Sequence, residues 1–394
     1  MSITIHGAGC VLMDYLYRGV DFADPRVTRL LRRRPGDGGL TIGGLVFAEA
    51  LEGFAGEPIG AILAEVADGR APDRQNAGGP AIVSLVNTAQ LCETAIVRFF
   101  GAVGDDETGA AIRSIVEQTP VDLSAMITAP GPSPATYVLS DPDYDGGHGE
   151  RMFINRLGVA ARIGLEDLGE DFVKADIVQL GGTALTPELH ESLPTLLRRA
   201  RTAGALTVVN TVYDFRAELT HPERRWTLGG DESYPPIDLL VTDAEEATRL
   251  TERATPEEAI DWFLERGVGA AIVTNGPRPV SFAATERRFA RVAPTSLPVM
   301  TEYAASPEVR AAHGDTTGCG DNFVGGVVAS IAEQLAAAGS PSTAPHRVDL
   351  TAAVRLGVAS GAFCMTHLGG TFIESSPGEK RRRIEAVAGE EAAR

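Results

Sequence analysis

Residues 314–323 read Gly-Asp-Thr-Thr-Gly-Cys-Gly-Asp-Asn-Phe, a turn bracketed by glycines and followed by a carboxylate. Apolar side chains then recur at every fourth position, which predicts a helix with one apolar stripe that begins near Asp321; they are Phe323, Val327, Ile331 and Leu335. Because Gly318 and Gly320 carry no Cβ, the free N–H groups at the helix start are open to an anion such as a phosphate. Asp321, fixed beside that anion, is then positioned to accept a proton from an attacking hydroxyl group.

The same residues have a plainer interpretation, in which the turn is an ordinary one and Asp321 is a helix-start residue favoured by the macrodipole. The full string, however, resembles the D-T-x-G-A-G-D signature of the ribokinase-like, or PfkB, carbohydrate kinases, with Cys319 in place of the usual alanine. The resemblance implies an ATP-dependent kinase with Asp321 as the base. It also implies an anion hole from the backbone of Gly318, Cys319 and Gly320, and nucleotide contacts from Thr316, Thr317, Gly318 and Gly320.

The composition describes an ordinary globular protein of 394 residues, 44% hydrophobic and 22% charged, long enough for one large core and a lid. The net charge of −18 argues against nucleic acid or an anionic membrane as a partner. Two basic runs, 32–34 and 380–383, are interpreted as solvated surface. The four scattered cysteines, the absence of a signal-like N-terminus and the absence of an apolar run of ~20 residues predict a soluble, cytoplasmic protein.

Several other enzyme classes lack their motifs. Lysine occurs only at Lys174 and Lys380, neither in a G-x-x-x-x-G-K-[ST] string, so a P-loop is absent, and no H-R-D catalytic loop is found. The run Gly7-Ala8-Gly9 lacks the third glycine of a dinucleotide fingerprint because position 12 is Leu12. The histidines form no H-E-x-x-H pair, which leaves a zinc hydrolase unsupported.

Strand-like runs alternate with helical patterns, which predicts an α/β fold with a central, mostly parallel sheet flanked by helices. The predicted strands are Ile3–Ile5, Ala95–Phe100, Ile177–Leu180, Leu206–Val209, Leu239–Val241 and Ala270–Val273. The predicted helices are Ala81–Cys92, Thr108–Gln118, Leu189–Ala203, Ala244–Leu250, Pro256–Arg266, Asn322–Ala338 and Leu350–Thr366. An extended loop, 293–313, is expected to lead into the signature.

Two regions, 14–76 and 135–161, break this alternation with short apolar runs interrupted by glycine, proline and charge. We expect them to form a small β-rich lid with an inserted segment, over a core of residues 1–13, 77–134 and 162–394. In ribokinase-like kinases a lid of this kind closes over the sugar. The stretch 26–74 is longer than the family usually has there, and a dimer element, an enlarged lid and a loosely ordered excursion all stay open.

The resemblance also implies acceptor-binding residues. Asp14 matches the aspartate that typically binds sugar hydroxyls, since a carboxylate accepts from two hydroxyls at once. Gly78 and Gly79 match the di-glycine motif, although Val83 stands where the family often has asparagine. Asn155, with its neighbour Arg156, either faces substrate or is an exposed strand residue.

Two further motifs concern the nucleotide and its metal. Asp243 and Glu246 resemble the N-x-x-E motif that organises magnesium, and their alternative interpretation is an acidic first helical turn. Thr274 and Gly276 resemble the T-x-G turn under the nucleotide. The small-residue helix 352–362, followed by Gly-Gly at 369–370, suits a wall of the adenine pocket. The implied cofactors are ATP and Mg²⁺, with a monovalent cation left open.

Together these features predict a kinase that phosphorylates a hydroxyl of a sugar or sugar-like small molecule. A nucleoside kinase of the same fold is the nearest alternative, and a non-catalytic sugar-binding regulatory protein is a more distant one. A homodimer formed through the lid is also left open by the sequence.

Overall fold

The computed structural model describes residues 2–34, 36–147, 149–312, 316–339 and 347–392, so Gly314 and Asp315 of the signature lie outside the described residues. Its large sheet has the strand order β14-β13-β12-β11-β10-β9-β1-β5-β6. All its pairs are parallel except β12–β13 and β13–β14. Its strands are β1 (Ile3–Gly9), β5 (Ala95–Gly104), β6 (Met126–Ala129), β9 (Ile177–Gly181), β10 (Leu206–Asn210), β11 (Leu239–Asp243), β12 (Ala270–Asn275), β13 (Arg278–Ala284) and β14 (Val292–Leu297). The mostly parallel sheet is therefore confirmed.

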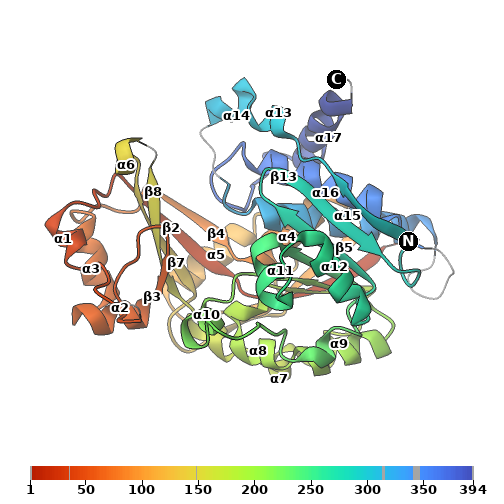
Figure 1. The fold of residues 1–394 in the computed structure, drawn as a ribbon, viewed down its shortest axis with the longest axis horizontal. Helices are drawn as coiled ribbons and strands as arrows, with labels where there is room; N and C mark the ends of the chain where they lie inside the picture. The colour runs from red at the N-terminus through yellow and green to blue at the C-terminus, as the bar shows by residue number, and fades with distance from the viewer. Residues whose placement is uncertain (1, 35, 148, 313–315, 340–346, 393–394) are drawn as a thin grey trace.

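Both faces of this sheet are buried, as expected for parallel strands between helices. In β11, Leu239 and Val241 join one apolar cluster, and Leu240 joins the other. One cluster is completed by α4 (Pro80–Leu91), α5 (Glu107–Val116), α15 (Cys319–Ala337) and α16 (Leu350–Cys364). The other is completed by α7 (Leu165–Leu168), α8 (Pro187–Glu191), α9 (Leu193–Thr202), α11 (Ala244–Thr251) and α12 (Pro256–Glu265). The blue helices α15 and α16 and the green helices α8 and α9 lie on opposite sides of the sheet (Figure 1).

The connections run outward in both directions from β1, which lies between β5 and β9. Such a switch point opens a crevice at the carboxyl ends of the strands, where ligands of α/β proteins bind. The start of α4 closes this crevice, because a Cβ on Gly181 would lie only 2.7 Å from the Cα of Ala81. The predicted di-glycine motif therefore lies at the switch point.

A second sheet of five strands, in the order β3-β8-β7-β2-β4, stands apart on the left of Figure 1. Its strands are β2 (Leu12–Arg18), β3 (Leu45–Phe47), β4 (Arg74–Gly78), β7 (Ala135–Asp141) and β8 (Glu150–Arg156), with α6 (Tyr144–Gly147) between β7 and β8. Three helices pack on it through a separate apolar cluster: α1 (Pro25–Thr28), α2 (Ala48–Ala55) and α3 (Ile59–Val66). The stretch 26–74 is thus largely a helical layer, which the expectation of a β-rich lid did not include.

Three predicted boundaries were wrong. The signature helix α15 begins at Cys319, two residues before Asp321, and the helix predicted over 189–203 is two helices that meet at Ser192. The stretch 293–313 holds most of β14 together with α13 (Thr301–Ala304) and α14 (Pro307–Ala312), so it is not one extended loop. The remaining helices are α10 (Phe215–Thr220) and α17 (Glu379–Ala392).

The signature helix is also buried almost all round, instead of along one stripe. It packs between α4 and α16, and adjacent glycines allow the close approach on both sides. A Cβ on Gly325 would lie 2.5 Å from the Ser84 carbonyl oxygen, and one on Gly326 would lie 2.4 Å from the Ser360 hydroxyl. Within the described residues, no helix has both the length and the apolarity that a membrane span requires.

Candidate active site

The anion-binding turn is built around Gly318, the N-cap of α15, which has a left-handed φ of 78°. A Cβ at this position would lie 2.4 Å from the Cα of Gly370, so only glycine fits. The Cys319 N–H points back to the Thr316 carbonyl oxygen at 3.3 Å. The N–H groups of Gly320 and Asp321 lie in the first helical turn, where no earlier helical carbonyl is available to them. These two amides are therefore available to an anion. Of the predicted donors Gly318, Cys319 and Gly320, this set includes Gly320, and the Asp321 N–H is an addition to the prediction.

Asp321 is the third residue of α15 and is partly exposed. Burial of its carboxyl group by the surrounding protein raises the pKa of Asp321 to about 6. A pKa near the working pH suits a general base, because the group is then both largely ionised and able to hold the proton it accepts.

A cavity of about 590 Å³ opens beside this turn. Four of the six predicted nucleotide residues line it, Thr274, Gly276, Thr316 and Gly320, together with Cys319 of the predicted anion hole. Thr317 and Gly318 do not line it: the Thr317 carbonyl oxygen accepts from the Cys364 thiol at the end of α16, and Gly318 packs on Gly370 of the loop behind the turn. Its volume is within the usual range for a small-molecule site. The geometry therefore brings the T-x-G turn and the signature together.

The remaining wall of this cavity is apolar. Helix α16 supplies Val358, Gly361 and Ala362, as expected for the small-residue helix, whereas Gly369 and Gly370 lie elsewhere, in the loop behind the turn. The segment before α13 and the first residue of that helix supply residues that the sequence did not single out, Val299, Met300 and Thr301. No periodicity marks these residues, because they belong to an irregular segment.

The acidic pair lies at the neighbouring strand end. The β11–β12 register places Asp243 beside Thr274 of the nucleotide cavity. Asp243 is the N-cap of α11, where its Oδ1 accepts the Glu246 N–H at 2.8 Å, so the helix-start interpretation holds for this residue. Glu246 is 7% exposed and accepts hydrogen bonds from the hydroxyls of Thr211 and of Thr242, the latter at 3.3 Å.

Burial, followed by the negative charge of Asp243, raises the pKa of Glu246 to about 8. Among the residues described, no group of three or more acidic, histidine or cysteine side chains is arranged to hold a metal. The pair nevertheless fits a hard cation held largely through water, since it offers carboxylate oxygens that lack a positive partner. Thr211, which the sequence analysis missed, directly follows β10, a position that could have signalled it.

Two of the residues predicted to bind the acceptor, Asp14 and Asn155, lie in one row across the small sheet. Asp14 of β2 lies opposite Asn76 of β4 and Thr136 of β7, and Thr136 lies opposite Asn155 of β8. Residues directly opposite in adjacent strands share a face, so these four polar side chains follow one another across it. The Thr136 hydroxyl donates to the Asn155 Oδ1 at 2.5 Å, and Asn155 is buried, so its interpretation as an exposed strand residue is wrong.

The di-glycine motif lies against this row of polar side chains. A Cβ on Gly78 would lie 2.0 Å from the Asp14 Oδ2, so the carboxylate lies directly over the di-glycine backbone. Gly79 has a φ of 110° and forms the N-cap of α4. Arg156, by contrast, donates to Glu52 of α2 at 2.8 Å and so binds the helical layer.

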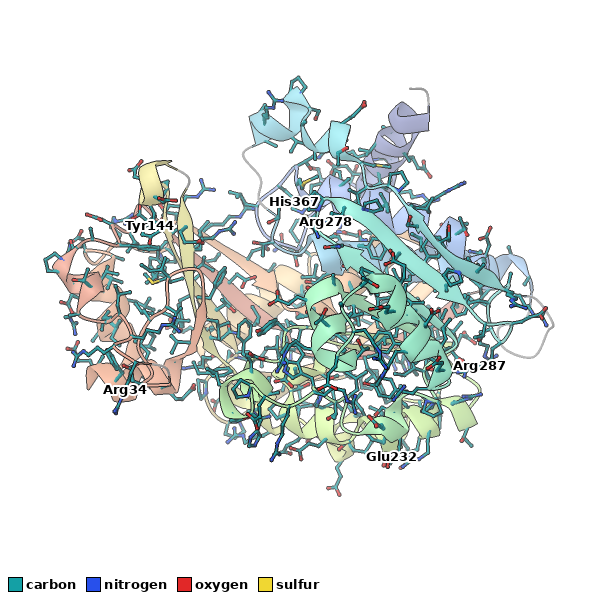
Figure 2. The ribbon with its side chains drawn as sticks, viewed as in Figure 1. Arg34, Tyr144, Glu232, Arg278, Arg287 and His367 are labelled. Carbon is teal, nitrogen blue, oxygen red and sulfur yellow. The ribbon has the colours of Figure 1, made fainter. Side chains whose placement is uncertain are left out.

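One loop, residues 368–371, connects the acceptor row with the anion-binding turn. The Asn76 Nδ2 donates to the carbonyls of Leu368 at 3.4 Å and Thr371 at 3.3 Å, while Gly370 packs on Gly318. Val83, which replaces the expected asparagine, packs against Gly370 from below and supports the same loop. Figure 2 shows Arg278 and Arg287 on either side of β13. Arg278 lies at the end of the strand near the candidate site, and Arg287 follows the opposite end of the strand.

Comparisons with known proteins agree with this geometry. The model of the pfkB family carbohydrate kinases matches residues 70–376. A fructokinase from Vibrio alginolyticus is 26% identical over 257 residues, covering 64% of this chain and 76% of that protein. A ribokinase from Arabidopsis thaliana complexed with ribose and ATP has a TM-score of 0.63 at 16% identity, covering 98% of this chain and 99% of that one. An adenosine kinase from Sinorhizobium meliloti has a TM-score of 0.68 at 18% identity, covering 97% and 99%.

The structural matches confirm the ribokinase-like fold, and at these identities they carry the fold alone. The family match is stronger evidence, because it extends over most of the chain and includes the di-glycine motif, the acidic pair and the signature. The chain therefore belongs to the pfkB family of carbohydrate kinases and is a phosphotransferase.

Proposed function

We propose that the protein transfers the γ-phosphoryl group of ATP to a hydroxyl of a sugar or sugar-like small molecule, with Asp321 as the base. One observation carries this proposal: a partly buried carboxylate with a raised pKa is located at an open helix start beside a nucleotide-sized cavity. In the reaction the acceptor oxygen forms a bond to the γ-phosphorus, the bond from that phosphorus to the bridging oxygen breaks, and ADP leaves. The hydroxyl proton passes to Asp321.

Each part of the cavity has a role in this proposal. The adenosine would contact the apolar wall of α16 and the Thr274–Gly276 turn, which directs its phosphates towards α15. The N–H groups of Gly320 and Asp321 would donate to the transferred group and stabilise the charge that develops on it. Catalysis would then consist mainly of positioning and electrostatic stabilisation.

Asp243 and Glu246 would hold a magnesium ion through its water molecules. That ion, when bound, neutralises negative charge on the ATP phosphates. The residues themselves contribute a buried acid whose pKa is raised without a cation, so a positive charge near it favours the ionised form. Dependence on a monovalent cation stays a prediction.

The small sheet would supply the acceptor site and act as a lid. Its row of Asn76, Asp14, Thr136 and Asn155 offers carboxylate, hydroxyl and amide groups, which suits a ligand with several hydroxyls. The α1–α3 layer packs on its strands, so strands and helices would move as one lid. The division into core and lid, and the homodimer through the lid, stay predictions.

A nucleoside acceptor is the second candidate, and one observation favours it. Leu12 and Asp14 alternate along β2, so they share a face, and Leu12 belongs to a buried apolar cluster with Cys10, Ala160 and Leu185. An apolar wall beside a hydroxyl-binding carboxylate would suit a base attached to a ribose. The fructokinase relative favours the sugar.

The test is a panel of sugars, sugar phosphates and nucleosides with ATP and magnesium, read as ADP release and as phosphorylated product. We expect turnover with one acceptor class, and a rate that rises with pH through about 6 as Asp321 ionises. ADP release that never exceeds the rate with ATP alone, across the panel, would contradict the proposed function.

A further inference from the structure

Lys380 is a buried lysine at the start of α17 and is 1% exposed, so the expectation of a solvated basic run at 380–383 was wrong for this residue. Its Nζ donates to the Asn322 Oδ1 at 2.8 Å and lies 5.9 Å from the centre of the Phe372 ring. Within the described residues no carboxylate forms an ion pair with it. Burying an ammonium group costs free energy, and this cost must be offset by the contacts that the group makes.

The bonded partner, Asn322, directly follows Asp321 and is fully buried. Its Nδ2 donates to the carbonyl oxygens of Gly318 at 2.9 Å and Gly370 at 2.8 Å. An amide side chain can face two ways, and an ammonium group only donates. The Lys380 ammonium therefore selects the orientation in which the Asn322 oxygen faces it and the NH₂ group faces both carbonyls.

The Gly318 carbonyl belongs to the proposed anion-binding turn, and the Gly370 carbonyl belongs to the 368–371 loop that packs against this turn. The Gly318 carbonyl oxygen also accepts from the Asn322 backbone N–H at 2.8 Å, so Asn322 donates two hydrogen bonds to the N-cap residue. Because peptide units are planar, fixing the Gly318 carbonyl also fixes the N–H of Cys319 and limits the direction of the amides that follow. Gly370 lies in the loop that also meets Asn76 of the lid strand β4.

We propose that Lys380 is a positioning residue for phosphoryl transfer, whose buried ammonium orients Asn322 and thereby holds the anion-binding turn and the 368–371 loop together. This inference rests on the proposed function. Lys380 touches neither reacting group, and it acts only through Asn322.

A dependence on pH follows. Burial lowers the pKa of Lys380 to about 8, and the negative charge of Glu374 in the preceding loop opposes this shift. The neighbouring Cys364 thiol of α16 has a pKa raised well above its usual value, so it is neutral in this range. The Arg383 Cζ lies 5.6 Å, and the centre of the His367 ring 5.3 Å, from the centre of the same Phe372 ring. Since the folded pKa lies below the usual value, the ammonium contact is present below about pH 8 and is lost as the pH rises past it.

The experiment compares Lys380→Met with Lys174→Met, which removes the other lysine of the chain, an exposed one paired with Asp171 at 2.8 Å. We expect Lys380→Met to lower kcat about 10- to 100-fold with the acceptor KM little changed, because the turn is misplaced by a fraction of an ångström. Its residual activity should lack the alkaline decline of the wild type above about pH 8. Lys174→Met should resemble the wild type in both measurements.

The variant Asn322→Asp distinguishes a role in positioning the turn from an effect on the stability of the fold alone. The aspartate can pair with Lys380, but it has no N–H to donate to Gly318 and Gly370, so the protein should fold while kcat falls about tenfold or more. A Lys380→Met that loses only melting temperature, with normal kcat in the folded protein, overturns the proposal. If Lys380→Met does not fold, a normal kcat in Asn322→Asp overturns it and a reduced one supports it.

Hydrogen exchange gives a readout that does not need turnover. Amides of residues 316–322 should exchange faster in Lys380→Met than in the wild type or Lys174→Met. If the wild type phosphorylates nothing while this difference is seen, the proposed function is wrong and the positioning contact stands. Unchanged exchange in an active enzyme would contradict the positioning role alone.

Discussion

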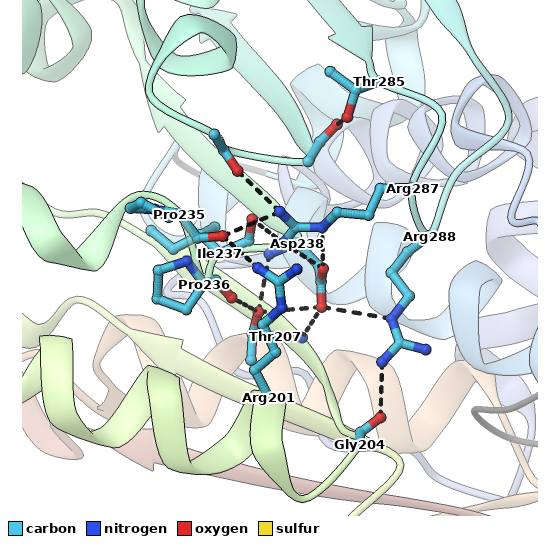
Figure 3. A network of polar contacts seen from close by, with 12 residues as sticks. Arg201, Gly204, Thr207, Pro235, Pro236, Ile237, Asp238, Thr285, Arg287 and Arg288 are labelled. Carbon is cyan, nitrogen blue, oxygen red and sulfur yellow. Dashed lines mark hydrogen bonds and ion pairs between the residues drawn. The ribbon is translucent and has the colours of Figure 1, made fainter.

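Directly before β11 the buried carboxylate of Asp238 is surrounded by cations and donors. After the same strand, in the first turn of α11, the buried carboxylate of Glu246 has only hydroxyl partners among the described residues. Asp238 is 1% exposed, and its Oδ1 accepts from the Arg287 Nε at 2.9 Å and Nη2 at 2.6 Å. Its Oδ2 accepts from the Thr207 N–H at 3.1 Å and lies 3.9 Å from the Arg288 Nε (Figure 3).

The cations of this amino-edge cluster are held in turn by backbone carbonyls. Arg287 donates to Pro235, Gly267 and Ile237, and Arg288 donates to Gly204. The cluster, defined as Asp238 with Arg287, Arg288 and Thr207, therefore meets the requirement that a buried charge be both paired and hydrogen-bonded. It joins the starts of β10 and β11 to the segment after β13 (Figure 3).

The carboxyl edge lacks such compensation. The pKa values of Glu246 and Asp321 are both raised, and burial is the first cause in each. A site whose desolvated acids have no cation paired with them in the described part of the chain is poorly arranged for stability and well arranged for a ligand that brings positive charge or a proton. The comparison thus predicts that changes at the amino edge affect stability and changes at the carboxyl edge affect turnover.

The largest effect should come from Asp321→Asn, which keeps the shape of the side chain and removes the base. We expect turnover to fall by about 10²–10⁴, with ATP binding nearly intact and a melting temperature that does not decrease. The matched control is Asp349→Asn, because Asp349 begins the neighbouring helix α16 as an N-cap and asparagine can cap as well. Near-normal turnover in Asp321→Asn would remove Asp321 from the mechanism.

The next effect should be on stability, from Asp238→Asn. Removing the charge leaves Arg287 and Arg288 facing a neutral group, and breaking a buried pair costs about 3–5 kcal/mol of unfolding free energy. The measurement is urea denaturation, with kcat taken at a temperature where the variant is folded. Asp231→Asn is the control, since Asp231 pairs with Arg225 at an exposed position and should cost about 1 kcal/mol or less. A large loss of kcat in folded Asp238→Asn would contradict the division between the two edges.

Asp14→Ala should act on the acceptor alone. We expect a rise in acceptor KM, or a loss of acceptor turnover, equivalent to about 1.5–3 kcal/mol for a charged hydrogen bond, while ATP affinity by calorimetry barely changes. Gly78→Ala sharpens the test, because its new Cβ would displace the Asp14 carboxylate and should reproduce the effect. Equal weakening of ATP and acceptor, or a lower melting temperature only, would assign Asp14 a structural role.

The smallest effect should come from Glu246→Gln, read as the magnesium concentration for half-maximal rate, which we expect to rise. Although Glu246→Gln should impair magnesium use, it should stabilise the metal-free protein at high pH. The raised pKa of Glu246 means that its stabilising contribution is complete below the unfolded value of 4.5 and is lost as pH rises through about 8. The variant should therefore gain melting temperature over the wild type at pH 8 more than at pH 5. An unchanged magnesium requirement would leave only the helix-start interpretation.

The sequence predicted the six central strands and most of the helices that cover them because those signals are local. Apolar runs of three to six residues mark strands buried on both faces, and the signature carries its turn chemistry in consecutive residues. It did not predict the helical layer over 26–74, because the helices there are short and their apolar faces are recognisable only against the small sheet that they cover.

The sequence predicted the individual motifs of the candidate site, but it did not predict how they are arranged in space. Thr274, Gly276, Thr316 and Gly320 were each found in sequence, but a shared cavity requires the β11–β12 register and the position of α15. Met300 and Thr211 were missed, since neither belongs to a periodic pattern. Their role depends on which strand ends lie beside each other, and that pairing is a long-range contact.

The sequence alone determined the chemistry that this chain can perform: the glycines, the carboxylates and their order are covalent facts, and their local propensities place them at strand ends and helix starts. Only the tertiary structure decided which charges are buried and which are paired. Lys380 occurs in a basic run that the sequence analysis interpreted as surface, and Asp238 directly precedes the apolar strand β11, yet packing by distant elements buries both. Burial is a property of everything around a residue, so the burial that shifts a pKa or orients an amide arises only when the whole fold closes.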